Sequence, residues 1–318
     1  MNREKEGKGN FCFTNPVMVV VMAVIYNLIS ACAYPVLHIG YAAFHVSNQD
    51  IGGILLFGGL RTLLGGGVVL LAAAIKQRRF PVLKKELLPA VLAVGFVLQF
   101  LQFFFCYIGL ANTSSSKGSI LYGMSTYFSI ILAHFVYKSD RLTGKKILGC
   151  ALGFLSIIVY NFNGLRENWG FTLLGDGALL CSAVFYAAGN NMNKKVVEKG
   201  DTMVIAAYQM IFGGSLLVGS GVAFGGCFEK IEPIGYITFA YLFSTLGLTF
   251  WLFSQLLKYN SLGKVTIFNA LMPIFGTIAS ALMLGENIGK WNILFAMFLA
   301  VIGIFLVNGE KSRQSGKM

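Results

Sequence analysis

The sequence predicts an all-α membrane protein of ten transmembrane helices, arranged as two five-helix repeats that are inverted relative to each other. Three observations predict this fold: the composition, the spacing of the apolar runs and an internal repeat. The 318 residues are 56% hydrophobic and 12% charged, with a mean hydropathy of +0.71. These residues include too few polar side chains to cover a water-soluble globule, so we expect the chain in a membrane.

A helical run of about twenty apolar residues matches the thickness of the hydrocarbon core of a bilayer. Ten such runs occur, at residues 17–39, 51–75, 87–110, 116–137, 145–163, 171–192, 203–224, 233–257, 263–284 and 291–308. Only Asn112 to Lys117 separates the third run from the fourth, and we expect a short reverse turn there. An even number of spans leaves both ends of the chain on one side of the membrane.

The basic residues are distributed as membrane topology requires, because cytoplasmic loops carry an excess of Lys and Arg. With the N-terminus in the cytoplasm, 20 of the 25 basic residues fall on cytoplasmic segments, four on the opposite side, and Arg61 within a run. We therefore expect a multi-pass protein of the cell inner (plasma) membrane with both termini cytoplasmic. The basic residues lie in short clusters and form no contiguous face, which excludes nucleic acid as a partner.

An internal repeat divides the chain into residues 1–166 and 167–318. Leu-Arg-Thr-Leu-Leu-Gly-Gly-Gly at 60–67 matches Tyr-Gln-Met-Ile-Phe-Gly-Gly-Ser at 208–215, and the paired glycines inside both segments are typical of close helix crossings. Five spans in each copy invert the second copy across the bilayer. Inverted repeats place a site for a small molecule where the halves meet, near the midplane.

Polar side chains recur every three or four residues in four of the runs, which places them on one face of each helix. They are Asn27, Ser30, Tyr34 and His38 in the first run, Ser119, Tyr122, Thr126 and Ser129 in the fourth, Ser182, Tyr186, Asn190 and Asn193 in the sixth, and Thr266, Asn269, Pro273, Thr277 and Ser280 in the ninth. We expect these faces to line a central cavity. The alternative is that they only form hydrogen bonds between helices.

Arg61 lies about ten residues into the second run, roughly 15 Å deep, where a guanidinium group needs water or a partner. No Asp or Glu lies at comparable depth in any predicted span. The partner is therefore expected to be a backbone carbonyl, or a carboxylate or phosphate of a substrate. Gln209 occupies the matching position in the second copy and is included among the candidate cavity residues.

Two lysines and two prolines are further candidates. Lys117 and Lys264 begin the fourth and ninth runs at matching positions of the two copies. Each either extends to the headgroups or contacts an anion. Pro35 and Pro273 lie inside the first and ninth runs and are expected to bend those helices at a gate.

Aromatic side chains in the third and eighth runs form either an apolar wall for a substrate or a belt that faces lipid. They are Phe103, Phe104, Phe105, Tyr107, Phe250, Trp251 and Phe253. The six cysteines are scattered, and no His, Asp and Glu cluster or Ser-His pair is apparent. We therefore expect neither a metal, nor a cofactor, nor an enzymatic activity.

Several motifs resemble those of one family. Arg-Thr-Leu-Leu-Gly-Gly at 61–66, Lys-Tyr-Asn-Ser-Leu-Gly-Lys at 258–264, Leu-Met-Pro-Ile-Phe at 271–275 and Leu-Gly-Glu at 284–286 are similar to segments of EamA-type members of the drug/metabolite transporter superfamily. The similarity extends over nearly the whole chain. It implies a bacterial inner-membrane carrier that moves metabolites such as amino acids by alternating access, often outward.

The expected function is therefore secondary transport of a small organic solute, amino-acid-like or anionic, by export or exchange. The absence of carboxylates from the middle of the predicted spans favours facilitated diffusion or exchange over a conventional Na⁺ or H⁺ site. The alternatives are an antiporter of phosphate-bearing metabolites or nucleotide sugars and, in a different class, a passive channel. The expected partners are the substrate and the lipid bilayer. The sequence leaves open whether two copies of the chain form a homodimer.

Overall fold

The computed structural model shows an α-helical bundle. It describes residues 13–47, 49–113, 115–137, 140–165, 171–284 and 290–308. Within these residues every regular element is helical and no strand occurs. Each predicted apolar run lies on one continuous stretch of helix, and the break after the third run is a turn at Asn112 and Thr113.

The first half of the chain contains α-helices, the short 3₁₀-helix η1 and one π-helical segment. The elements are α2 (Pro16–Ala43), α3 (Ile51–Gln77), η1 (Lys85–Leu87), α4 (Leu88–Val94), the π-helix η2 (Gly95–Leu101), α5 (Gln102–Ala111), α6 (Ser115–Val136) and α7 (Gly144–Leu165). Asn15 caps α2 by accepting hydrogen bonds from the N–H groups of Val17 and Met18, and Asp50 caps α3 through the N–H of Gly53.

The second half has two irregular segments inside its helices. The elements are the π-helix η4 (Leu173–Gly177), α8 (Ala178–Val197), α9 (Thr202–Ala223), α10 (Pro233–Tyr259), α11 (Leu262–Thr266), the 3₁₀-helix η5 (Ile267–Leu271), α12 (Met272–Leu284) and α13 (Lys290–Asn308). Asp201 caps α9 by accepting from the N–H of Met203.

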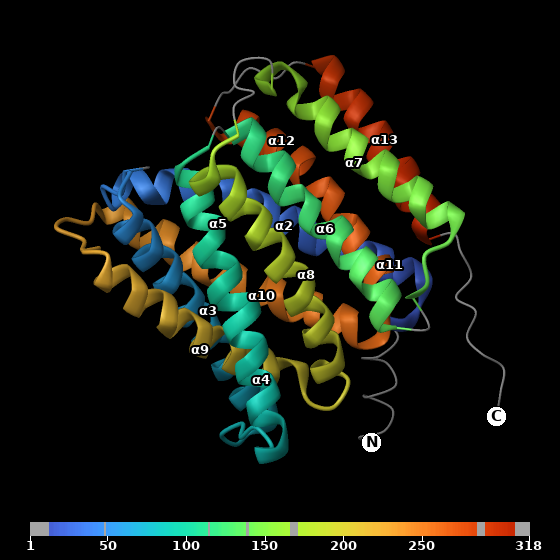
Figure 1. Ribbon diagram of the computed structural model, residues 1–318. Helices are drawn as coiled ribbons and strands as arrows, with labels where there is room; N and C mark the ends of the chain where they lie inside the picture. Colours follow the sequence, from blue (N-terminus) through green and yellow to red (C-terminus); the bar gives the residue numbers. More distant parts are fainter. Residues whose placement is uncertain are drawn as a thin grey trace.

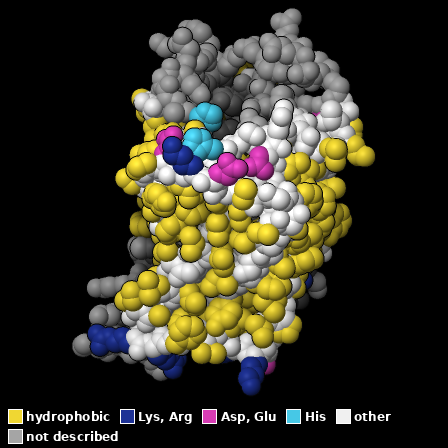
Figure 2. Space-filling view, turned by 90° about the vertical axis from the view of Figure 1, so that its left-hand side faces the viewer, with side chains coloured by type: hydrophobic (Ala, Val, Ile, Leu, Met, Phe, Trp, Pro, Cys, Tyr) yellow, Lys and Arg dark blue, Asp and Glu magenta, His cyan; other side chains and the backbone are white. Residues whose placement is uncertain are grey.

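The structure is that of a multi-pass membrane protein. Among the described residues, six helical stretches are long and apolar enough to cross a bilayer: Pro16–Ala43, Ile51–Gln77, Lys85–Ala111, Leu173–Val197, Thr202–Ala223 and Pro233–Tyr259. Large apolar side chains such as Leu71, Ile75 and Phe305 are exposed, as expected where lipid replaces water. Figure 2 shows one face of the bundle, which is largely hydrophobic between two ends that carry charged side chains.

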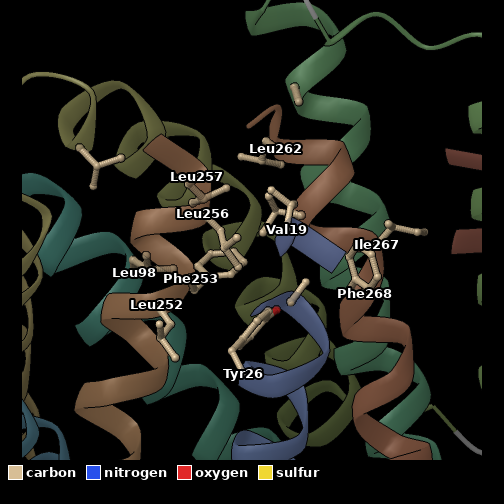
Figure 3. Packing of buried hydrophobic residues seen from close by; sticks show 14 of the residues in the cluster. Val19, Tyr26, Leu98, Leu252, Phe253, Leu256, Leu257, Leu262, Ile267 and Phe268 are labelled. Atoms are coloured by element: carbon tan, nitrogen blue, oxygen red, sulfur yellow. The ribbon is translucent and has the colours of Figure 1, made fainter. Parts of the chain in front are cut away.

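Helices distant in sequence pack side by side. The closest pairs are α3 with α9, α7 with α13, α6 with α8, and α2 with α10, while α2 also contacts α12 and α8 also contacts α5 (Figure 1). One large core joins α2, α10 and α11. Figure 3 shows Phe253, Leu256 and Leu257 of α10 close to Val19 and Tyr26 of α2. A second, aromatic core around Phe44 and Phe57 lies at the far end of α2.

Glycine contacts allow α3 and α9 to approach closely, as the paired glycines predict. A Cβ atom on Gly214 would lie 2.5 Å from the backbone N of Leu63, and one on Gly59 would lie 2.6 Å from the N of Val218. Neither distance is compatible with a side chain unless the helices separate. Backbone contact of this kind is how small residues drive association in lipid, where burial of apolar surface contributes little.

We predict that Gly214→Ala lowers the stability of the bundle by about 1–3 kcal/mol, because the added methyl group overpacks the α3–α9 contact. The matched control is Gly219→Ala on the same helix, where a Cβ atom meets nothing within 4 Å. Thermal unfolding of the purified protein in detergent measures both variants. Equal midpoints for the two would contradict this account of the contact.

Candidate functional site

A cavity of about 510 Å³ lies in the centre of the bundle. Side chains from α2, α3, η2, α5, α6, α7, α8, α10, η5 and α12 line it, so both halves of the chain contribute. The lining reaches Leu37, Leu110 and Gly118, close to the ends of their helices. In the opposite direction it stops at Tyr26 on α2 and Phe253 on α10, which belong to the large core. The cavity therefore extends toward one end of the bundle and is closed by packing at the other.

A hydrogen-bonded chain of three polar side chains crosses the cavity at its closed end. The hydroxyl of Tyr26 donates to Oδ1 of Asn269, and Nδ2 of Asn269 donates to the hydroxyl oxygen of Tyr186 at 2.9 Å. The ring of Tyr122 packs edge-on against Tyr186, with centroids 6.3 Å apart. Asn269 lies in η5, where the change from α- to 3₁₀-helix occurs within the span. This chain links α2, α8 and the ninth predicted span.

Arg61 borders the cavity from α3 and is half-buried. Its Nε donates to the carbonyl oxygen of Leu242 on α10 at 3.2 Å. That carbonyl also accepts a bond from Thr245 at 3.2 Å, so it is shared. Within the described part of the chain, no carboxylate forms an ion pair with Arg61. Among the described residues, the printed hydrogen bond of the guanidinium is thus this one backbone contact.

The π-helix η2 and the start of α5 present a run of side chains to the cavity. Leu98, Gln99, Gln102 and Phe103 all line it. The extra residue in a π-helical turn changes the direction of side chains, and such segments recur at functional sites. Gln102 is fastened to α8, since the hydroxyl of Ser182 donates to the Gln102 carbonyl at 2.9 Å and Gln102 Nε2 donates back at 3.4 Å.

Aromatic rings form much of the remaining wall. Phe103 and Tyr107 come from α5, while Phe250 and Phe253 come from α10. Their place in the lining favours the apolar wall over the lipid belt for these four side chains. By contrast, Phe104 and Phe105 pack against each other and against Phe224 and Phe185 outside the cavity lining.

The structure brings about half of the predicted site residues together. Ser30, Arg61, Tyr122, Tyr186, Asn190 and Asn269 line the cavity. Asn27, Ser182, Gln209 and Lys264 do not. Asn27 is fully buried and bonds the carbonyl of Ala23, and Gln209 donates to Asn193 at 3.0 Å. Gln209 thus joins α9 to α8, which is the alternative interpretation of the stripes, whereas the bond of Asn27 lies within its own helix.

The remaining predicted residues give no geometry for a site. The side chains of Tyr34, Lys117 and Pro273 lie outside the described residues. Pro35 is buried inside α2, which runs as a single helix from Pro16 to Ala43. Among the described residues, no group of three or more His, Cys, Asp or Glu side chains is placed to hold a metal ion.

Several lining residues escaped the sequence analysis. Tyr26, Gln99, Gln102, Thr245 and Thr249 all line the cavity. Gln99 with Gln102, and Thr245 with Thr249, repeat at intervals of three and four in the third and eighth runs, so the stripe criterion applied to those runs would have found them. Tyr26 precedes Ser30 by four residues and extends the stripe of the first run.

Beyond the closed end of the cavity, a cluster of polar contacts holds the helices together. We call it the closing cluster and define it as Tyr137, Asp140, Lys146, Lys194 and Gly263. Asp140 is 1% exposed and accepts from Nζ of Lys146 at 2.9 Å and from the N–H of Gly263 at 3.0 Å. It therefore fastens the α6–α7 connection to the start of α11.

Lys194 and Tyr137 form further hydrogen bonds within the closing cluster. Nζ of Lys194 donates to the carbonyls of Leu257 and Asn260 at 3.0 and 2.8 Å, which neutralises the C-terminal end of α10. The hydroxyl of Tyr137 donates to the carbonyl of Asn191 at 2.5 Å.

Comparison with known proteins places the chain among transporters. The model of the EamA-like transporter family matches residues 17–162 and 173–309. A relative named S-adenosylmethionine/S-adenosylhomocysteine transporter, from Chlamydia muridarum, is 28% identical over 86% of this chain and 88% of its own length. A probable amino-acid metabolite efflux pump from Escherichia coli is 23% identical over 80% of this chain and 89% of its own. One solved structure shares the fold, with a TM-score of 0.71 at 14% identity, covering 90% of this chain and 97% of that one.

Proposed function

The chain belongs to the EamA-like transporter family of the drug/metabolite transporter superfamily, and from this we propose that it carries small metabolites across the membrane by alternating access. The observation that supports this most is the central cavity, which both halves of the chain line and which is closed at one end. A carrier needs such a chamber near the midplane, with access from one side at a time.

The proposal includes ten spans in two inverted repeats, residues 1–166 and 167–318. The pattern of helix contacts supports it. In this correspondence α2 matches α8, α3 matches α9, α5 matches α10, α6 matches α12 and α7 matches α13. The contact of α2 with α10 then has its counterpart in α8 with α5, and that of α2 with α12 in α8 with α6. The pairs α3–α9 and α7–α13 each join a helix to its own counterpart, as a pseudo-twofold axis requires. The family model also matches each half separately.

We assign the described conformation to the outward-facing state. The closing cluster contains Lys146 and Lys194, which fall on segments that the excess of Lys and Arg places in the cytoplasm. The closed end of the cavity is then cytoplasmic, and the end near Leu37, Leu110 and Gly118 faces outward. Both termini are cytoplasmic in this orientation.

We propose an amino-acid-bearing nucleoside, of the S-adenosylmethionine and S-adenosylhomocysteine type, as the substrate. Arg61 is the one cationic side chain in the described cavity lining, and no Asp or Glu lies in that lining. A single guanidinium suits one carboxylate. The aromatic rings of Tyr107, Phe250 and Phe253 suit an adenine face and a sulfonium cation. The name of the Chlamydia muridarum relative agrees with this chemistry.

The cavity favours this substrate over the alternatives. A phosphate-bearing metabolite carries more negative charge than one described arginine balances. A passive channel needs a continuous aqueous path, whereas the core around Tyr26 and Phe253 blocks the inner end.

Counterflow in proteoliposomes tests the proposal. Purified protein is reconstituted in vesicles loaded with S-adenosylhomocysteine, and uptake of labelled S-adenosylmethionine is followed. We expect saturable uptake that is faster in loaded than in empty vesicles, because a carrier returns more quickly when it is occupied. Vesicles without protein are the control. Flux that rises linearly with concentration and ignores the internal ligand would identify a channel instead.

A further inference from the structure

Two carboxamide side chains at the cavity have no hydrogen-bond partner among the described residues. Gln99 is 2% exposed and Asn190 is 1% exposed, and both line the cavity. Nδ2 of Asn190 is fully enclosed without an acceptor. A buried amide left unpaired is costly, because it has lost water and gained nothing in return. These two side chains therefore need an explanation that the fold itself does not supply.

The other two carboxamides of the described cavity lining, Gln102 and Asn269, already have partners. Asn269 is bonded on both sides by Tyr26 and Tyr186, and Gln102 exchanges bonds with Ser182. Asn193 accepts from Gln209 and donates to Ser254. Thr249 donates to a carbonyl of its own helix, at residue 245. Gln99 and Asn190 differ from these neighbours in lacking any such partner within the described chain.

Close backbone packing fixes the positions of both side chains. A Cβ atom on Gly189 would lie 3.1 Å from Cα of Leu98, so α8 and η2 approach each other directly beside Asn190 and Gln99. On the other side, a Cβ atom on Gly213 of α9 would lie 2.4 Å from Cβ of Gln99. The two amides are thus presented by adjacent helices that have no room to shift, which suits a binding group that must be held in place.

We propose that Gln99 and Asn190 form the subsite that recognises the adenine base of the substrate through its 6-amino group. This inference rests on the proposed function and names the residues that select the substrate. A carboxamide offers an acceptor beside a donor and pairs with an adenine edge through two hydrogen bonds. One N–H of the 6-amino group lies beside ring nitrogen N1, and the other lies beside N7. An adenine therefore presents one donor–acceptor edge to each of the two carboxamides. The aromatic rings of the wall cover the base faces, while Arg61 takes the carboxylate.

Equilibrium binding to purified protein tests the subsite without requiring flux. S-adenosylhomocysteine is compared with its analogue that lacks the 6-amino group. We expect the wild type to prefer the amino compound by about tenfold or more, since a bidentate contact of this kind discriminates by about 1–3 kcal/mol. In the double variant Gln99→Leu/Asn190→Leu the preference falls to within about twofold. The apo protein melts at the same or a higher temperature, because unpaired buried amides have been replaced by apolar groups.

The control variant is Thr249→Val, which also lines the cavity but whose hydroxyl is bonded within its own helix, and it should keep the preference. Equal affinity of the wild type for the two ligands, or a preference that survives in the double variant, would overturn the subsite. Neither result would contradict the transport function, which the counterflow experiment tests separately. Conversely, selective binding without saturable counterflow would remove the transport proposal and leave the subsite standing.

Discussion

Arg61→Ala should reduce transport to near background while leaving the amount of protein in the membrane unchanged. The guanidinium is the cationic group in the described cavity lining, and its Nε is bonded to one backbone carbonyl. A hydrogen bond to a charged group contributes about 1.5–3 kcal/mol, so its loss corresponds to a decrease of at least about tenfold in affinity for a carboxylate. Initial rates of counterflow across a range of substrate concentrations measure the effect.

Arg61→Lys provides the matched comparison. The ammonium group keeps the charge, but it lacks the planar fork that binds a carboxylate through two bonds. We expect partial recovery, with a raised half-saturating concentration. A substrate analogue amidated at its carboxylate separates binding from scaffolding: the wild type should lose affinity for it, and Arg61→Ala should not discriminate against it. Normal flux in Arg61→Ala would show that Arg61 does not bind the substrate and that its role is the structural contact with the carbonyl of Leu242.

Asp140→Ala should lower the thermal stability of the protein more than any surface change. The carboxylate is 1% exposed and the Nζ of Lys146 is nearly as enclosed. Removing one member of a buried ion pair costs about 3–5 kcal/mol, because the other charge stays buried without a partner. The N–H of Gly263 also loses its acceptor. Thermal unfolding in detergent, followed by size-exclusion fluorescence, measures the change.

Two comparisons separate the buried charge from general damage. In the double variant Asp140→Asn/Lys146→Met both charges are removed together, so most of the stability should return. Glu198→Ala breaks a second ion pair, with Lys194 at 2.9 Å, whose carboxylate side chain is 46% exposed. That change should cost under about 1 kcal/mol. An unfolding midpoint for Asp140→Ala equal to that of Glu198→Ala would show that the closing cluster contributes little.

The closing cluster also connects stability to the transport cycle. Asp140 fastens the α6–α7 connection to α11, and Lys194 fastens α8 to the end of α10. In the alternating-access cycle that we propose, both contacts break before the cavity opens at this end. Weakening them should therefore shift the population toward the state that is open on the side of the closing cluster, by an amount set by the free energy of the lost contacts.

The polar stripes illustrate how far the sequence predicts the site. Periodicity shows which side of a helix avoids lipid, and Ser30, Tyr122, Tyr186, Asn190 and Asn269 from the predicted stripes lie in the cavity lining. It cannot distinguish a cavity from a neighbouring helix, because both are polar surroundings in an apolar solvent. Ser182 follows the same spacing, yet it bonds the carbonyl of Gln102 on α5, and Asn27 bonds the carbonyl of Ala23 on its own helix.

Gln99 and Gln102 lie three residues apart in the third run, so their spacing indicates a shared face that the sequence analysis did not use. The spacing does not show that Gln102 is bonded to Ser182 while Gln99 has no partner among the described residues. Asp140 was not recognised as a structural residue for a similar reason. Its partners are Lys146, six residues away, and Gly263, which is 123 residues away. No local pattern indicates a contact of that length.

The sequence by itself determined that this is a helical membrane protein, because apolar length and the placement of charge are properties of single segments in lipid. Its motifs, such as Leu-Met-Pro-Ile-Phe at 271–275, indicated the EamA type by resemblance. Only the tertiary structure decided which polar groups face the cavity and which bind each other. Those outcomes depend on where helices cross, and the crossings are set by backbone contacts such as those of Gly59, Gly189 and Gly214. In lipid, such close contacts and hydrogen bonds hold helices together, and both require the whole assembly to be in place.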